Sequence, residues 1–211
     1  MTDVTPIRRR RGRPSKDDPG PIATRDELLR AGLALLTEKG FSAAGLDEIL
    51  KTAGVPKGSF YHYFDSKEAF GLALIDEYSS YFARKLDRFL QDETLAPLDR
   101  LAAFIADARG GMARHGFRRG CLVGTLGQEM GALPDSFRQR LIDVFADWQR
   151  RTALCLDAAQ AAGAVSRRLE CDHMAEWFWI GWEGAVMRAK LEGGPAPLDR
   201  FAEGFFRLVQ A

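Results

Sequence analysis

This chain of 211 residues has few cysteines and histidines, with three of each. Cys121, Cys155 and Cys171 show no paired spacing, which argues against a disulfide framework and favours reduced thiols. The run Cys171-Asp172-His173 holds metal-ligand side chains, but no second matching pair completes a site. We therefore predict neither a bound metal nor a cofactor.

Long apolar segments and enzyme motifs are also absent. No apolar run reaches the ~18 residues that span a membrane, and no apolar segment follows the arginines near the start, as a secretory signal requires. We accordingly expect a cytoplasmic protein that contacts no membrane. There is no glycine-rich phosphate loop and no nucleophile elbow. Cys121 and His115 match no recognised nucleophile–base spacing, so we expect no catalytic residues and no enzyme.

Alternation with a period of two, the mark of exposed strands, is missing throughout. From residue 23 onward apolar residues recur at helical spacing, with Pro and Gly at the edges of the segments. The pattern predicts an all-α fold, with a small domain over residues 23–66 and a larger helical domain over 67–211. The expected helices run over about 24–39, 46–53, 57–63, 67–90, 97–115, 120–130, 134–162, 172–191 and 197–208, with Thr24, Ser66 and Asp172 as caps.

Positive charge is concentrated at the start of the chain, although the net charge is only +1. Residues 1–22 combine a cluster of arginines with several Pro and Gly, so we expect a disordered basic arm. Arg11-Gly12-Arg13-Pro14 resembles the core of an AT-hook, in which arginines enter a narrow A·T minor groove. We favour such a contact by Arg11 and Arg13 over the alternative, a solvated charge run.

The segment from Gly54 to Lys67 is the most informative part of the sequence. Gly54 ends one helix, and Pro56 fits the turn that follows. Phe60 and Phe64 are four residues apart and can face inward together. The side chains left to face outward suit a short recognition helix in a DNA major groove; they belong to Lys57, Gly58, Ser59, Tyr61, His62 and Tyr63. An ordinary surface helix is the alternative.

This segment, with the residues around it from Thr24 to Ala73, resembles the TetR family of transcriptional regulators. The resemblance implies that residues 46–53 and 57–63 are the two helices of a helix-turn-helix. Ser59, Tyr61 and Tyr63 fall at DNA-contacting positions of the family, and Lys67 falls where a family lysine meets a phosphate. It also implies a homodimeric repressor on a palindromic double-stranded operator, released by a small-molecule effector.

Two faces of the expected helix over residues 172–191 carry different side chains. Small and apolar residues lie on one face, which we expect to join the 198–208 stripe in an intersubunit four-helix bundle; they are Phe178, Gly181, Ala185 and Ala189. The alternative is that both stripes serve only the intrachain core. The other face carries Trp179, Glu183, Met187 and Lys190. Buried charge is costly, so this face indicates either a ligand pocket or a salt bridge from Glu183 to Lys190 or Arg188.

Gly120-Cys121-Leu122 and Ala189-Lys190 resemble a TetR subgroup of electrophile- and acrylate-responsive repressors. With the face described above, this predicts an effector site of Cys121, Arg119, Trp179, Trp182, Glu183, Met187 and Lys190. Acrylate could bind reversibly, with its carboxylate on Arg119, Arg188 or Lys190 and its vinyl group against Trp179 or Trp182. Alternatively, Cys121 could be alkylated or oxidised with Lys190 as its partner, because neighbouring cations lower a thiol pKa. An inert, buried Cys121 is the third reading.

Overall fold

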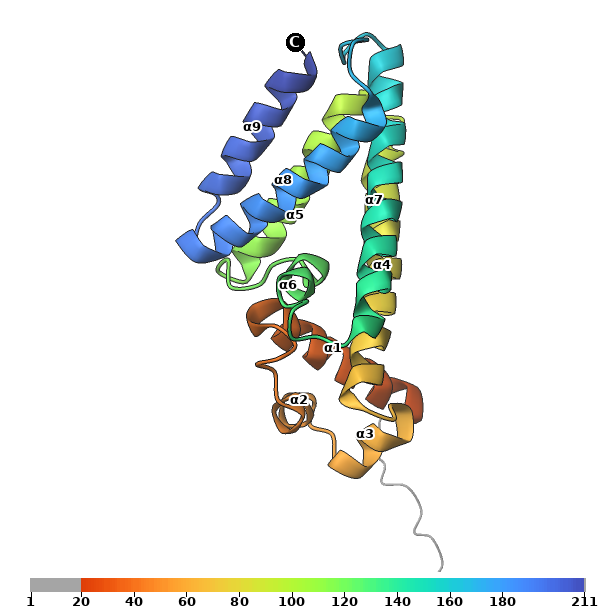
Figure 1. Cartoon of the computed structure of the whole chain (residues 1–211), viewed down its shortest axis with the longest axis vertical. Coiled ribbons are helices and arrows are strands. Elements are labelled where there is room, and N and C mark those ends of the chain that lie inside the picture. The colour runs from red at the N-terminus through yellow and green to blue at the C-terminus, as the bar shows by residue number, and fades with distance from the viewer. Residues whose placement is uncertain (1–19, 211) are drawn as a thin grey trace, which may run out of the picture.

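The computed structural model describes residues 20–210, and this part of the chain is built from helices without strands, as predicted (Figure 1). Most of the basic arm, including Arg11 and Arg13, lies outside the described residues. The helices are α1 (Gly20–Lys39), α2 (Leu46–Ala53), α3 (Lys57–Tyr63), α4 (Lys67–Leu90), α5 (Pro97–Arg114), α6 (Leu122–Gln128), α7 (Asp135–Ala161), α8 (Cys171–Glu192) and α9 (Ala196–Gln210). None of them combines the length and apolarity that a bilayer crossing requires.

Most of the expected helix ends are confirmed by their backbone geometry. Gly54 follows α2 with a φ of +68°, a left-handed conformation that glycine adopts without strain. Ser66 caps α4, because its hydroxyl accepts a 3.0 Å hydrogen bond from the Ala69 N–H. Two expected caps were wrong. α1 begins at Gly20, before Thr24, and α8 follows Glu170, so Asp172 already lies in its first turn.

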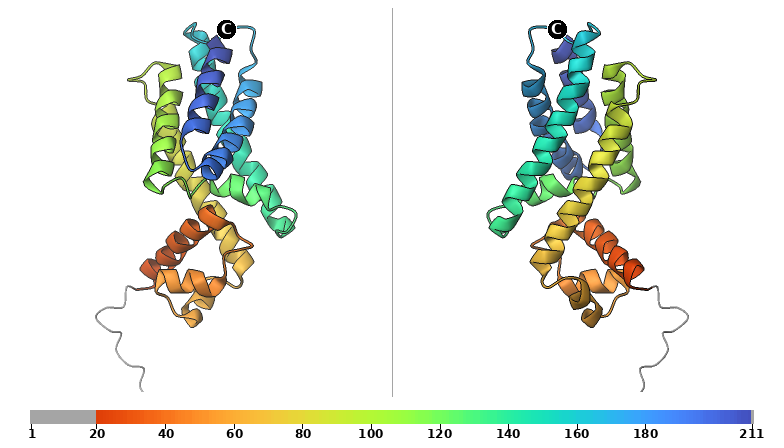
Figure 2. Two further views of the ribbon diagram at one scale, coloured as in Figure 1. Left: turned by 90° about the vertical axis from the view of Figure 1, so that its left-hand side faces the viewer. Right: turned by 90° about the vertical axis from the view of Figure 1, so that its right-hand side faces the viewer.

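α1, α2 and α3 form a small unit at the foot of the molecule, and α4 runs from it into the upper bundle of α5, α7, α8 and α9 (Figures 1 and 2). The short α6 lies at the junction, against α1 on one side and α7 on the other. Aromatic rings fasten the two parts together: Phe41, after α1, meets Phe137 of α7 edge-on at 5.1 Å between centroids. The junction is therefore packed rather than a loose linker.

The residues predicted to form the dimer face of α8 do not form an exposed surface. Phe178, Ala185 and Ala189 are buried within the single chain. A Cβ added to Gly181 would lie 2.3 Å from the Phe201 ring, so the small residues of this face admit α9 of the same chain. A neighbouring face of α8 is exposed instead, with Ile180 66% and Leu191 78% accessible. The intrachain alternative accounts for the small residues that the sequence contains there.

Candidate functional site

The outward side of α3 carries the side chains expected of a recognition helix. Phe60 is fully buried and anchors the helix, while Tyr61 is 52% exposed. Lys57, Gly58 and His62 are exposed, and Ser59 and Tyr63 are half-buried. The Lys57 ammonium also lies 3.3 Å from the Asp47 carboxylate of α2, in an exposed ion pair.

Lys67, at the start of α4, is directed inward in this structure. Its ammonium donates a 2.7 Å hydrogen bond to the Phe41 carbonyl and lies 4.3 Å from the centroid of the Phe41 ring. Burial lowers the pKa of this lysine, and the carboxylate of Glu129 partly opposes that effect. Lys67 therefore stabilises the loop between α1 and α2, a contact that the sequence did not indicate.

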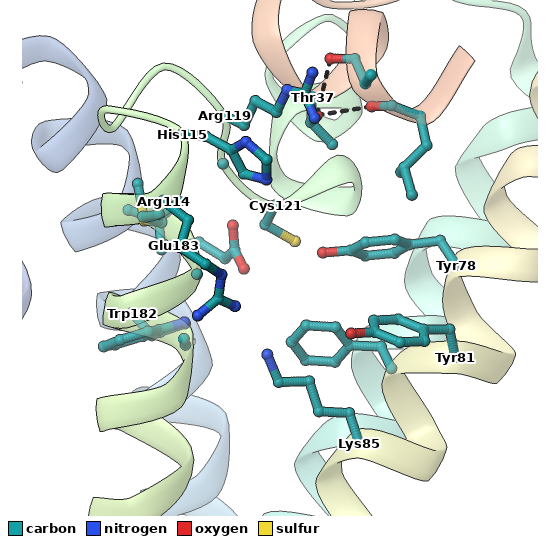
Figure 3. Close-up of a pocket in the computed structure, with 18 of the residues that line it drawn as sticks. Thr37, Tyr78, Tyr81, Lys85, Arg114, His115, Arg119, Cys121, Trp182 and Glu183 are labelled. Carbon is teal, nitrogen blue, oxygen red and sulfur yellow. Dashed lines mark hydrogen bonds between the residues drawn. The ribbon is translucent and has the colours of Figure 1, made fainter. Parts of the chain in front are cut away.

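A cavity of about 440 Å³ lies between α1, α4, α5 and α8, and we call it the main cavity (Figure 3). Its apolar wall is aromatic, with Tyr78, Tyr81, Phe82 and Trp182 among its residues. Cations come from four different segments: Arg30, Lys85, Arg114 and Arg119 all line it. Glu183 is the one acidic side chain in the lining formed by the described residues. The charge of this lining favours an anion, and the volume suits a small organic molecule.

Tyr78, Cys121 and Glu183 form a cluster at the inner end of the main cavity, and we call it the thiol cluster (Figure 3). Burial raises the pKa of the Cys121 thiol well above its usual range, and the hydrogen-bonded Glu183 carboxylate raises it further. Donation by the Gly124 N–H and the Tyr78 hydroxyl offsets part of this rise. The expected low thiol pKa was therefore wrong, because the cations of the site do not face the sulfur.

Glu183 occupies an unusual position for a carboxylate. Its Oε1 atom is buried and has no hydrogen-bond partner within residues 20–210. Burial raises its pKa from 4.5 to about 7, and the bond from Cys121 slightly opposes the rise. The alternative of an internal salt bridge was wrong, since Arg188 pairs with Glu192 at 2.6 Å and Lys190 turns to α1. Glu183 is thus a carboxyl group with a pKa near neutral pH, and it lies beside a thiol.

A smaller cavity of about 170 Å³, the side cavity, lies on the other side of the thiol cluster. Cys121, Glu183 and Val186 line both cavities, while Met187 and Lys190 line only the side cavity. The two cavities converge on the thiol and the carboxyl group.

The main cavity borders the small unit directly, because Arg30, Ala34 and Thr37 of α1 belong to its wall. The last turn of α1 is held by the larger domain: Lys190 Nζ donates to the Thr37 carbonyl at 2.9 Å, and the Gly120 N–H donates to the same oxygen at 3.2 Å. Below α6, the Glu129 carboxylate accepts a 2.9 Å hydrogen bond from the Ser42 N–H.

The structure thus brings six of the seven expected effector residues to the main cavity or the side cavity: Arg119, Cys121, Trp182, Glu183, Met187 and Lys190. Trp179 is different. It is buried in the aromatic core against Trp148, and its indole N–H donates to the Thr152 hydroxyl at 3.0 Å. Arg188 lines neither cavity.

Sequence reasoning missed several polar residues of the main cavity, among them Tyr78, Tyr81, Lys85 and Arg114. Tyr78, Tyr81 and Lys85 recur at intervals of three and four along α4, so their shared face carried a signal. Arg114 stands at the end of α5, where basic residues are common, and gave no signal. Within residues 20–210 no cluster of three His, Cys, Asp or Glu side chains could hold a metal ion.

Comparisons with known proteins agree with this architecture. Residues 28–74 match the family described as bacterial regulatory proteins, tetR family, and residues 97–205 match the tetracyclin repressor-like C-terminal domain. The transcriptional regulator AcuR of Cereibacter sphaeroides is 59% identical over 98% of this chain and 95% of its own. The repressor NemR of Escherichia coli is 35% identical over 83% of this chain and 88% of its own. A crystal structure of regulatory protein TetR from Rhodobacter sphaeroides covers 87% of this chain and 97% of its own, with 61% identity and a TM-score of 0.86.

Proposed function

This chain belongs to the TetR family of bacterial regulatory proteins, and from that premise we propose that it binds a palindromic operator as a homodimer and leaves it when a small effector fills the main cavity. Its class is that of a DNA-binding transcriptional repressor rather than an enzyme. The effector we propose is acrylate or a related small electrophilic carboxylate.

The reading unit is α3, supported by the exposed side chains of Lys57, Tyr61 and His62. Two such helices related by a two-fold axis reach successive major grooves, about 34–36 Å apart, and therefore favour a palindrome. Apolar side chains that one copy leaves exposed on α8 and α9 supply a surface for the second copy; they include Ile180, Leu191 and Leu208.

The charge of the main cavity is the observation that carries the effector assignment. Arg114 and Lys85 extend into the space between Trp182 and the rings of Tyr78 and Tyr81 (Figure 3). Lys85 is already ion-paired with Asp107 at 2.6 Å, so Arg114 is the cation of this pair that holds a carboxylate, with the unsaturated end of the effector toward Cys121. Arg119 lies at the α1 side of the same cavity, 4.0 Å from Glu38.

Release follows from the shared wall between the cavity and α1. An effector that contacts Arg30 or Thr37 changes the surroundings of a helix in the DNA-binding unit. It weakens operator binding if it binds more tightly to a conformer in which α1 and α3 are no longer spaced for DNA. The packed junction at Phe41 and Phe137 transmits that shift to the reading unit.

A second candidate mechanism is covalent sensing by Cys121. The observation that favours it is the thiol cluster, in which the sulfur lines both cavities beside a carboxyl group and a phenol. A thiol added to the double bond of the effector would hold the released state until the protein is replaced.

Fluorescence anisotropy of a labelled duplex from the region upstream of the gene tests the proposal. Acrylate should release the bound protein, and propionate, which has the same charge without the double bond, should not. Operator binding unchanged by acrylate would overturn the effector, and equal affinity for random duplex would overturn the operator. A Cys121→Ser variant that still responds to acrylate would remove the covalent mechanism and leave the reversible one.

A further inference from the structure

Cys121 faces a difficulty if it is to react with an electrophile. The thiolate is the nucleophilic form of cysteine, and burial raises the pKa of this thiol, so free thiolate is scarce. Lys190, the cation expected to lower the pKa of this thiol, instead donates hydrogen bonds to the Thr37 and Glu38 carbonyls. A reaction at Cys121 therefore needs a base in contact with the sulfur that takes the proton as the new bond forms.

The charged and titratable groups around Glu183 leave few candidates for that base. They are Arg30 of α1, Tyr78, Tyr81 and Lys85 of α4, Arg114 and His115 of α5, Arg119 and Cys121 of the following loop, and Lys190 of α8. Arginine and lysine side chains are protonated donors. Burial raises the pKa of Tyr78, which keeps its hydroxyl protonated and a donor to the sulfur. Glu183 and His115 remain, and only Glu183 is hydrogen-bonded to the thiol.

We propose that Glu183 is the proton acceptor for Cys121, so that the thiol cluster adds the S–H bond across the double bond of an α,β-unsaturated effector. This inference rests on the proposed function through its covalent mechanism. It assigns a chemical role to Glu183 and extends the effectors from acrylate to unsaturated carbonyl compounds as a class.

The addition balances without an oxidant or any further reactant. The Cys121 proton passes to a carboxylate oxygen of Glu183 while the sulfur bonds to the β-carbon of the alkene. The π-electron pair moves to the α-carbon and its carbonyl, giving an enolate. Protonated Glu183 then returns the proton to the α-carbon, which restores the carboxylate and leaves a thioether. Arg114 stabilises the negative charge of the enolate from the cavity side.

The position of Glu183 depends on Gly124 in the facing turn of α6. A Cβ at Gly124 would lie 1.9 Å from the Glu183 Oε2 atom, so the carboxyl group fits only because this residue has no side chain. The Gly124 N–H also lowers the pKa of the Cys121 thiol, against the rise that burial causes. Backbone, carboxyl group and thiol are thus packed as one unit, and the unpartnered Oε1 atom is free to take a proton.

The two routes to a reactive thiol predict different pH profiles. The pKa of Glu183 is about 7, so the fraction able to accept a proton rises through neutral pH and is complete about one to two units above it. A thiol that reacts only after ionising by itself would gain rate above its own raised pKa instead. The shape of the profile therefore identifies the proton acceptor.

The experiment measures the rate of Cys121 adduct formation by intact-protein and peptide mass spectrometry, using the full-length protein from about pH 5.5 to about pH 9.5. Acrylamide is the probe, because it carries no charge of its own that titrates or competes for Arg114. The wild-type rate should rise through about pH 7 and then level off. Glu183→Gln should lose on the order of 100-fold near pH 7.5 and the inflection with it, while Glu183→Asp retains part of both and His115→Gln retains both.

Several outcomes overturn the inference. They are a wild-type profile that rises only above about pH 9, an E183Q rate equal to the wild-type rate, or loss of the inflection in H115Q. The pH profile of the wild-type rate tests the inference without any variant, so the test still stands if E183Q misfolds. Anisotropy of the operator duplex, measured on the same samples, tests the proposed function separately from the role of Glu183. Operator binding with effector release but no adduct rejects the role of Glu183 and keeps the proposed function. Adduct formation with the predicted profile but no operator binding rejects the proposed function and keeps the chemistry.

Discussion

The ammonium of Lys190 lies 2.9 Å from the carbonyl oxygen of Thr37, so α8 is hydrogen-bonded to the last turn of α1. A second bond, 3.2 Å long, reaches the Glu38 carbonyl. The final carbonyls of a helix have no partners of their own, and a lysine that caps them also complements the helix dipole. Lys190 therefore joins the two domains in this conformation, in addition to lining the side cavity.

Lys190→Met should uncouple the domains while keeping the length of the side chain. We expect the free energy of unfolding to fall by about 1.5–3 kcal/mol, the usual worth of charge-assisted hydrogen bonds. The ratio of operator affinities with and without acrylate should shrink. Chemical denaturation and anisotropy measure the two effects. Arg188→Met is the matched control, because Arg188 lies two residues away and pairs only on the surface with Glu192. Equal effects of both variants would contradict the coupling role.

Gly124→Ala and Gly127→Ala form a second matched pair on α6. Alanine normally stabilises a helix by roughly 0.5–1 kcal/mol over glycine, and nothing lies within 4 Å of a Cβ at Gly127. At Gly124 the added methyl group must displace the Glu183 carboxyl group. We expect G127A to raise the melting temperature and keep the effector response, and G124A to lose the response. An unchanged response in G124A would show that the placement of Glu183 does not matter.

Glu183→Gln should alter the pH dependence of stability. The folded-state pKa of about 7 lies above the ordinary value of 4.5, so the folded wild type binds an extra proton between these values. The free energy of unfolding of the wild type is highest below about pH 4.5 and falls as the pH rises through about 7, by up to about 3–3.5 kcal/mol. The stability of E183Q lacks that fall, so the variant should become more stable relative to the wild type as the pH rises to neutral. Urea denaturation at a series of pH values checks this, and parallel curves would refute it.

Arg114→Gln should discriminate charged from uncharged effectors. Loss of the guanidinium removes a charge-assisted contact, so the acrylate concentration for half-release should rise by about 10-fold or more. The response to acrylamide, which has no carboxylate to lose a contact, should fall by a smaller factor than the response to acrylate. Arg109→Gln on the same helix is the control, since Arg109 pairs with Asp199 at 2.8 Å and lines neither cavity. Anisotropy titrations measure both responses.

Tyr61→Ala should weaken operator binding without unfolding the protein. The ring is 52% exposed on α3, so its loss costs little stability, whereas a lost base or phosphate contact costs about 1–3 kcal/mol. Tyr81 of α4 is 54% exposed and far along the chain from the reading unit, so Tyr81→Ala is the control for removing an exposed ring. Circular dichroism and operator titration separate the two properties, and equal affinities for both variants would contradict a reading role for Tyr61.

The fold could be predicted because its signals are local. Gly54, Ser66 and Pro97 mark helix ends through their own backbone preferences, and each boundary held to within a residue or two. The faces of α8 could not be assigned as safely. Small residues such as Gly181 permit close approach to any helix, and sequence does not say whether that helix belongs to the same chain or to a second copy.

The candidate site was predicted in part for a related reason. Cys121 and Glu183 were singled out by residue type, but the thiol environment depends on Tyr78, which comes from a helix far away in the sequence. The direction of the Lys190 side chain could not be predicted either. The sequence pairs this lysine with Cys121 by resemblance only, and in the structure its ammonium binds a backbone carbonyl of α1 instead. Geometry between segments that lie far apart in the sequence decided both cases.

Arg30, Ala34 and Thr37 belong both to the first helix of the small unit and to the wall of the main cavity. Anyone who redesigns this protein as a biosensor for another compound therefore meets two kinds of position. Substitutions on the α1 wall would change ligand preference and basal promoter output together, which confounds a screen. Tyr81, Ala108 and Gly111 line the same cavity from α4 and α5, outside α1. Substitution libraries at these positions should change the range of ligands while the promoter output without ligand stays the same.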